Sequence, residues 1–406
     1  MTRETVRDWA TDYDIFDPEY VKNPYPVWDE LRQRCPVAHT DRWGGSWMPT
    51  RYDDVYAIAQ GIDQFSSREV LVVPVGPPPS GEGPERDPFY GVRAPPITSD
   101  PPEHTWARRL LLPPFSIRSI ERWEQETRER CRSLVDQFID NGRADAAADY
   151  AQEIPPFVIA SMLGIPRDMT DRFTQWVREL LEFGLTNREL GTRARTRVLS
   201  FLRQCIADRK TGLRGDDLIS HLLQAKVDGK PVPEQHILGT CFLLLVAGID
   251  TTWSSIGSAL WHLAQHPEDR LRLRTEPELL PTAVEELLRA YSPVTMARIV
   301  SQEIEVNGCK MTPGDRVLMS FPAANRDPEV FPDAERVILD RRHNPHVAFG
   351  VGIHRCVGSN LARMEMRMAI QEWLARIPDF RLEEPAAVTW AGGQVRGPRS
   401  LPVVFP

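Results

Sequence analysis

The sequence predicts a mainly α-helical fold with a small β region, closed as one domain over residues 1–406. Three observations favour this fold. Long stretches of the chain place apolar residues three and four positions apart, which is the spacing of one helix face. Alternation of apolar and polar residues, the pattern of a strand with one buried face, is limited to short segments. No internal repeat and no long Ser/Gly linker divides the chain, so a second domain is not expected.

Four segments carry the helical pattern. The apolar spacing predicts long helices over residues 120–141 and 168–206. A third helix begins at residues 233–234 and ends before Pro267, because proline fits the first turn of a helix but not its interior. The fourth helix follows at residues 361–377.

Strand signals concentrate in residues 299–320, where alternating residues surround two turn sequences, Asn307-Gly308 and Pro313-Gly314-Asp315. Residues 46–50 predict another short strand. Residues 70–102 are instead dense in proline and glycine. A loop of this length inside a compact protein is usually functional or disordered.

Composition limits the class of protein. Apolar residues make up 41 % and charged residues 26 %, which predicts a large globular core. The net charge of −8 argues against a nucleic-acid partner, although it leaves room for a local basic face. The N-terminus has no basic start followed by an apolar run, so neither a signal peptide nor a membrane anchor is expected. The most apolar stretch, residues 237–248, is well short of the ~20 residues that span a bilayer.

The cysteines indicate a reduced, cytoplasmic protein, because they are scattered and form no CxxC pair. The missing CxxC pairs also argue against an iron–sulfur module, and no glycine-rich nucleotide-binding motif is present. Most such cysteines are small buried hydrophobes. The six are Cys35, Cys131, Cys205, Cys241, Cys309 and Cys356.

Cys356 lies in the stretch FGVGIHRCVGSN, residues 349–360, and its context differs from that of the others. One interpretation is a glycine-rich loop with a buried cysteine. The other is a loop that presents a thiolate to a metal, since Gly350, Gly352 and Gly358 permit positive φ angles and close approach to a flat group. The cysteine also precedes a predicted helix, whose N-terminal dipole favours an anion.

Two further motifs lie on predicted helices. In residues 247–252 the Thr251 hydroxyl can bond the Ala247 carbonyl, which together with Gly248 opens a local kink that presents polar groups to water. The alternative is an ordinary buried helix with Asp250 turned outward and a structural Thr252.

Charged pairs at helical spacing complete the set. Glu286 and Arg289 are three residues apart, and His104 and Arg108 are four apart on one helix face. Each pair is also typical of a solvated helix surface.

These motifs, in this order, resemble those of the cytochrome P-450 monooxygenases, from NPYPVW near Asn23 to the C-terminal RGPRSLPVVF. The pattern Phe349-Gly350-x-Gly352-x-His354-x-Cys356-x-Gly358, followed by Leu361-Ala362, is similar to the family's haem-binding signature. The resemblance implies the cytochrome P-450 fold of the soluble bacterial type, haem b as cofactor, and Cys356 as the thiolate ligand of its iron. It also implies that the remaining cofactor-binding residues are His104, Arg108, Arg298, His354, Phe349, Gly350 and Ala247, with the first four directed at the haem propionates.

The same resemblance assigns roles to the other motifs. Asp250 and Thr251 match the family's acid–alcohol pair, which guides protons during oxygen activation. Glu286, Arg289 and Arg336 match its buried structural network, although Val337 stands where the family often has phenylalanine. The implied substrate pocket is mainly apolar and is lined by residues 70–102, the region around Leu181 to Leu185, Leu243, Leu244, Ala247, Val294, Thr295 and Gln394.

The implied activity is insertion of one oxygen atom of O₂ into a hydrophobic small organic molecule. Because the chain lacks nucleotide and iron–sulfur motifs, electrons from NAD(P)H would arrive through a separate ferredoxin or flavodoxin and its reductase. We expect a monomer that binds no membrane, with a docking patch formed by Arg108, Arg109, Arg342, Arg355 and Arg363. The haem portion of a longer fusion protein fits the same residues.

Two other functions fit a haem-thiolate protein, a peroxygenase driven by H₂O₂ and a haem-thiolate sensor or ligand-binding protein. Asp250 and Thr251 argue against both, because a proton-delivering pair serves an enzyme that activates O₂.

Overall fold

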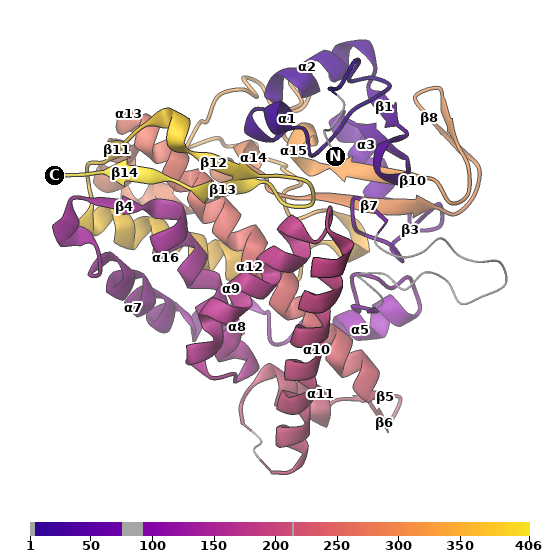
Figure 1. The fold of residues 1–406 in the computed structure, drawn as a ribbon, viewed down its shortest axis with the longest axis horizontal. Helices are drawn as coiled ribbons and strands as arrows, with labels where there is room; N and C mark the ends of the chain where they lie inside the picture. Colours follow the sequence, from indigo (N-terminus) through magenta and orange to yellow (C-terminus); the bar gives the residue numbers. More distant parts are fainter. Residues whose placement is uncertain (1–4, 75–91, 213–214) are drawn as a thin grey trace.

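The computed structural model describes residues 5–74, 92–212 and 215–406, and Figure 1 shows a helix-rich protein in which most strands lie in the upper half of the view. The mainly α-helical prediction is confirmed. The α-helices are α1 Pro18–Lys22, α2 Tyr25–Arg34, α3 Tyr52–Gln60, α5 Glu103–Leu111, α6 Ile117–Glu121, α7 Glu124–Val135, α8 Ile154–Leu163, α9 Thr170–Arg178, α10 Arg188–Lys210, α11 Leu218–Gln224, α12 Glu234–Gln265, α13 Pro267–Thr275, α14 Leu280–Ala290, α15 Phe321–Ala324 and α16 Ser359–Arg376.

The strands are short and form a five-stranded sheet, in the order β1-β2-β10-β7-β3, together with smaller sheets. The strands are β1 Val37–Thr40, β2 Ser46–Pro49, β3 Phe65–Ser66, β4 Arg143–Asp145, β5 Lys226–Val227, β6 Lys230–Pro231, β7 Thr295–Val300, β8 Ile304–Val306, β9 Cys309–Met311, β10 Arg316–Ser320, β11 Arg381–Leu382, β12 Thr389–Ala391, β13 Gly397–Ser400 and β14 Pro402–Val404.

The predicted hairpin at Asn307-Gly308 is present between β8 and β9. Its two residues have φ angles of 48° and 79°, which is the pair of positive angles that a type I′ turn requires. The predicted strand at residues 46–50 is β2, which pairs with β1 and with β10.

Helix α12 is the central element, and the predicted start and end are confirmed. It packs against α8, α10 and α16, and nearly every side chain from Ile237 to Val246 is buried. Gly248 permits close approach to α8, because a Cβ there would lie 2.7 Å from the Cδ1 atom of Ile159. Helix α12 is also long and apolar enough to cross a membrane, but 83 % of that apolar window is buried inside the protein. It is therefore a core helix.

Two predicted helices are interrupted. Residues 168–206 form α9, a π-helical turn at Glu179–Phe183, and then α10 from Arg188. The break has a local cause, since the Asn187 side chain accepts the amide of Leu190 and so starts a new helix. Residues 120–141 likewise divide, into the end of α6, α7, and a 3₁₀ turn. Apolar periodicity continues across both breaks and conceals them.

Candidate functional site

The cysteine loop joins the sheet region to the start of α16. Gly350 and Gly352 have φ angles of +65° and +70°, in the left-handed region that favours glycine. The Cys356 amide donates to the Phe349 carbonyl at 2.8 Å, which folds the loop back on itself. A Cβ on Gly358 would lie 3.8 Å from the Cys356 sulfur, which is an ordinary van der Waals contact, so this glycine lies next to the thiol.

The Cys356 side chain is exposed, yet the surrounding protein removes much of the sulfur's water. Burial therefore raises the pKa of the thiol, while the backbone N–H of Gly358 and the nearby guanidinium groups of Arg108, Arg355 and Arg363 lower it. These donors and cations are the groups that stabilise a thiolate. Burial is the largest of these effects, so the pKa of the thiol is raised overall, and the same donors and cations would stabilise a thiolate once it ligates a metal.

Four basic side chains from three parts of the chain meet beside this loop, and we call them the basic cluster: His104 and Arg108 on α5, Arg298 on β7, and His354 in the loop. The imidazole rings of His104 and His354 lie 4.3 Å apart between centroids. Sequence analysis placed all four at one site, and the structure brings them together.

The basic cluster is short of negative charge. Burial lowers the pKa of Arg298 to about 10, and burial together with Arg298, His104 and Arg108 lowers the pKa of His354 to about 2. Asp100 acts on Arg298 and His104, but its carboxylate already accepts from Ser66 and Ser67.

The Nε2 atom of His104 is buried and has no hydrogen-bond partner among the residues that the structure describes. Buried donors and cations of this kind fit an anionic group, and a carboxylate in particular.

On α12, Ala247 is exposed although the residues before it are buried, and Thr251 is half-buried one turn further on. The Thr251 hydroxyl donates to the Ala247 carbonyl at 2.8 Å, as the sequence predicts. Helix α12 is nevertheless one continuous helix through this position.

The neighbouring acid, Asp250, is 1 % exposed and points into the protein. Its Oδ1 atom accepts from Arg399 at 2.8 Å and from the Ser254 hydroxyl at 3.3 Å. Arg399 on β13 also donates to Glu182 at 2.9 Å. Burial raises the pKa of Asp250, Arg399 lowers it and Glu182 raises it. Sequence analysis missed Arg399, because no local pattern connects residues so far apart in the chain.

The structural network is centred on Glu286 and Arg289, both 0 % exposed. Arg289 donates twice to Glu286 at 2.8 Å and also to the carbonyls of Asn325, Ala334 and Arg336. The Arg336 side chain is exposed, so this residue joins the network only through its carbonyl. The second guanidinium on Glu286 is that of Arg341, at 3.0 Å, which sequence analysis did not single out.

The side chains expected to line a pocket are mostly packed in the core. Leu243, Leu244 and Thr295 are buried and Val294 is half-buried. The Gln394 side chain accepts from the Val72 amide at 2.9 Å and donates to the Val70 carbonyl, so it braces the start of the proline-rich segment. Leu181 and Leu185 are buried as well. Residues 75–91 of that segment lie outside the described residues.

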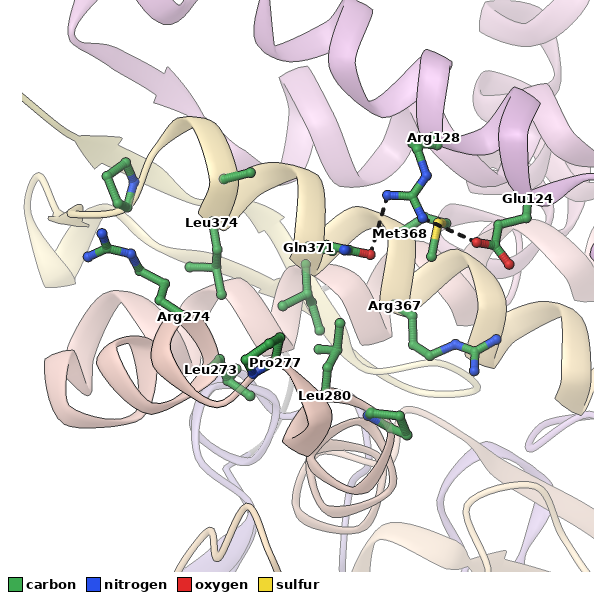
Figure 2. Close-up of a pocket in the computed structure, with 14 residues that line it drawn as sticks. Glu124, Arg128, Leu273, Arg274, Pro277, Leu280, Arg367, Met368, Gln371 and Leu374 are labelled. Atoms are coloured by element: carbon green, nitrogen blue, oxygen red, sulfur yellow. Dashed lines mark hydrogen bonds and ion pairs between the residues drawn. The ribbon is translucent and has the colours of Figure 1, made fainter.

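A separate cavity of about 520 Å³ lies between α7, α13, α14 and α16 (Figure 2). Its floor is apolar, with Leu273, Leu280 and Leu374, while Arg128 on its wall is bound to Glu124 and Gln371. The residues that line this cavity include none of the expected site residues.

The fold and the cysteine loop fit the expected family, and comparison with known proteins shows the same family. The sequence profile of the cytochrome P-450 family matches residues 92–386. The chain is 36 % identical to mycinamicin IV hydroxylase/epoxidase of Micromonospora griseorubida over 93 % of its own length and 94 % of the relative's. The solved structure of the bacillaene polyketide synthase cytochrome P-450 PksS from Bacillus subtilis superimposes with a TM-score of 0.87, at 31 % identity, covering 97 % of this chain and 99 % of that one.

This chain therefore belongs to the cytochrome P-450 family and is a cytochrome P-450 monooxygenase. A third similar protein is P-450BioI, solved in complex with an acyl carrier protein ligated to hexadec-9Z-enoic acid. It has a TM-score of 0.85 and 29 % identity, with 96 % of this chain and 99 % of that one covered. The family's cofactor is haem, and the residues present fit it. The open thiol of Cys356, the unbalanced basic cluster and the unpartnered His104 nitrogen suit an iron and two carboxylates.

Proposed function

We propose that Cys356 holds the iron of haem b, and that His104, Arg108, Arg298 and His354 hold its two propionates. The observation that carries this assignment is the shortage of negative charge in the basic cluster. Arginine suits a carboxylate because its planar fork donates two charge-assisted hydrogen bonds. Phe349 and Gly350 would shape the loop that holds the haem, and the exposed Ala247 on α12 would leave room for it. When bound, haem with a thiolate ligand supplies the chemistry that activates O₂.

The chain's own contribution to that chemistry is proton handling on α12. Thr251 holds its hydroxyl proton on the Ala247 carbonyl and lies on the exposed side of the helix, where water can replace that bond. Asp250 is the adjacent acid, and burial raises its pKa, which favours its protonated form relative to that of an exposed aspartate. An acid and an alcohol in this arrangement favour an enzyme that uses O₂ over one driven by H₂O₂ and over a sensor.

Electrons from NAD(P)H arrive, in this proposal, through a separate ferredoxin or flavodoxin with its reductase. Exposed Arg109, Arg342 and Arg355 support a basic docking face for an acidic partner. Arg363 is a weaker candidate than the sequence suggested, because it donates twice to Glu285 and stacks over the ring of Phe349. A single-domain, cytoplasmic protein that acts as a monomer is consistent with this arrangement.

The substrate we propose is a hydrophobic small organic molecule. The side chains expected around the pocket are apolar, and Gln394 has both ends of its amide engaged by the backbone. Relatives with named activities include a mycinamicin IV hydroxylase/epoxidase and a methyl-branched lipid omega-hydroxylase. Both relatives oxygenate their substrates, but the substrates differ. We therefore propose the same class of reaction for this protein and name no individual substrate.

The test uses the haem-loaded protein with a panel of hydrophobic compounds, which are first screened for a change in haem spin state. Compounds that bind are then incubated with O₂, NAD(P)H and a surrogate ferredoxin and reductase. We expect oxygenated product that depends on all three. Product formed with H₂O₂ alone, at a rate that the reductase system does not match, would indicate the peroxygenase. Binding without product in either system would indicate a sensor.

A further inference from the structure

The junction between α12 and α13 gathers three metal-ligating side chains away from the cysteine loop in sequence: His262, His266 and Asp269. One ligand atom from each lies within 4.8 Å of the other two. His262 lies in the last turn of α12 and Asp269 in the first turn of α13, with His266 between the two helices. His266 ends α12 and precedes α13 with φ −120° and ψ 79°, so the chain bends at the middle ligand.

His262 is oriented on both of its ring nitrogens. The Nε2 atom lies 2.8 Å from Oδ2 of Asp269, and Nδ1 lies 2.8 Å from the hydroxyl of Tyr291, which follows α14. The His262 side chain is 2 % exposed, so these two contacts fix the orientation of a buried ring. A metal-bound histidine normally donates its other ring N–H to a fixed acceptor, and Tyr291 is placed to accept it.

His266 supplies the adjustable ligand. Its side chain is 45 % exposed, and its ring stacks on that of His262 with centroids 4.2 Å apart and planes at 20°. Its Nδ1 atom lies 3.2 Å from Glu268, so a second carboxylate lies at the edge of the cluster. Rotation of this exposed ring can bring its free nitrogen toward the His262–Asp269 pair without disturbing the core.

We propose that this cluster binds one Zn²⁺ ion. The ligands are Nε2 of His262, the ring of His266, the carboxylate of Asp269 and one water molecule. Two imidazoles and one carboxylate in a partly enclosed site suit Zn²⁺, whereas Mg²⁺ and Ca²⁺ prefer sites made of oxygen ligands alone. The ion takes the place of the proton on Nε2 of His262, and the neutral ring carries its one proton on Nδ1 instead, from which it is donated to the Tyr291 oxygen. No bond is oxidised or reduced. The bound ion joins α12 to α13 and, through Tyr291, to the end of α14.

A different explanation for the cluster is a histidine–aspartate hydrogen bond that only fixes the helix junction. The two explanations differ in whether the exposed His266 matters for zinc affinity. The haem-loaded protein is therefore titrated with Zn²⁺ against a chelating dye, so that the iron site is filled and Cys356 is not available. Zinc-edge X-ray absorption then reports the ligands, expected as nitrogen and oxygen at roughly 2.0–2.1 Å.

We expect one zinc ion per chain, with affinity lost at least about ten-fold in both His266→Ala and Asp269→Asn, and about ten-fold in Tyr291→Phe through the outer contact. His343→Ala removes an exposed histidine elsewhere and should bind zinc as the parent does. His266→Ala removes no buried group, so its absorption spectrum should still show a normally loaded haem. The proposal is overturned if the parent binds no zinc at millimolar concentration, or if His266→Ala and Asp269→Asn bind it as tightly as the parent.

Discussion

Replacing Arg399 with methionine should destabilise the protein in a way that depends on pH. Arg399 donates to Asp250 at 2.8 Å, to Ser254 at 3.0 Å and to Glu182 at 2.9 Å, and all of these contacts are buried or nearly so. Methionine keeps an unbranched stem against the ring of Trp253, over which the guanidinium lies at 5.2 Å. The substitution therefore removes mainly the positive charge and its donors.

The size of the expected loss in stability depends on Asp250, the acid that loses its partner. Breaking a buried ion pair by removing one partner costs about 3–5 kcal/mol, unless the remaining group neutralises. Asp250 can neutralise by taking a proton, and for an acid with an unfolded pKa near 3.9 this costs about 4 kcal/mol at pH 7 and about 1.5 kcal/mol at pH 5. Glu182 contributes less, because Arg178 still pairs with it at 3.0 Å.

The sign of the pH dependence is fixed by the direction of the pKa shift. Burial already raises the pKa of Asp250, and loss of Arg399 raises it further. A carboxyl group whose folded pKa exceeds its unfolded pKa favours the folded state below the unfolded value, and that stability is lost as pH rises toward the folded pKa. The free energy of unfolding of Arg399→Met should therefore fall further below that of the parent as the pH rises from 5 to 7.

The assay is urea unfolding followed by far-ultraviolet circular dichroism at pH 5 and pH 7, with the free energy taken from linear extrapolation. The matched control is the double variant Asp250→Asn/Arg399→Met, which removes both charges and should recover most of the loss at pH 7. An equal loss at the two pH values, or a double variant less stable than Arg399→Met, would refute the reasoning.

Three further predictions concern the haem, the proton path and the partner. Cys356→Ser should lose the red-shifted Soret band of the reduced carbon-monoxide complex, because a neutral hydroxyl does not replace a soft anionic ligand; a retained band contradicts the ligand assignment. Thr251→Ala should keep its stability within about 1 kcal/mol, since one hydrogen bond is exchanged for the best helix former. It should nevertheless release more H₂O₂ and less product per NAD(P)H consumed, and unchanged coupling would make Thr251 structural. Arg109→Glu and Arg342→Glu should slow association with an acidic ferredoxin, more at low salt than at high salt. Arg143→Glu, on β4 at the other side of the molecule in Figure 1, is the control, and equal association rates for all three would remove the two arginines from the docking face.

The parts of the structure that depend on neighbouring residues could be predicted from the sequence. The bounds of α12 follow from Pro233 and Pro267, and the hairpin follows from Asn307-Gly308, because each signal acts within a few residues. The break before α10 also has a local signal in Asn187, but the apolar spacing on both sides outweighed it. Caps are short signals, and periodicity over a long window conceals them.

The contacts that could not be predicted are those made by single arginines from distant segments. Arg341 donates to Glu286 at 3.0 Å from a segment that has no helix or strand. Arg336 is another arginine in the same segment, so residue type and position do not distinguish the two. Which of the two guanidinium groups is buried against Glu286 depends on the course of the backbone in the folded protein. The same holds for Arg399 and Asp250, which lie on β13 and α12.

The acid on α12 is therefore positioned by tertiary structure rather than by its own motif. The sequence places Asp250 beside Thr251, but consecutive helix residues point about 100° apart, and here the alcohol faces the exposed side while the acid faces the core. Arg399 and Ser254 hold the carboxyl group in that direction, and Arg399 also binds Glu182 in the π-helical turn after α9. A proton that moves between Asp250 and Thr251 must cross from one face of the helix to the other, which requires water or rotation of the acid. Release of Asp250 from Arg399 is the step that would permit such rotation, so substitutions in β13 or in the turn after α9 should alter proton delivery without touching the haem site.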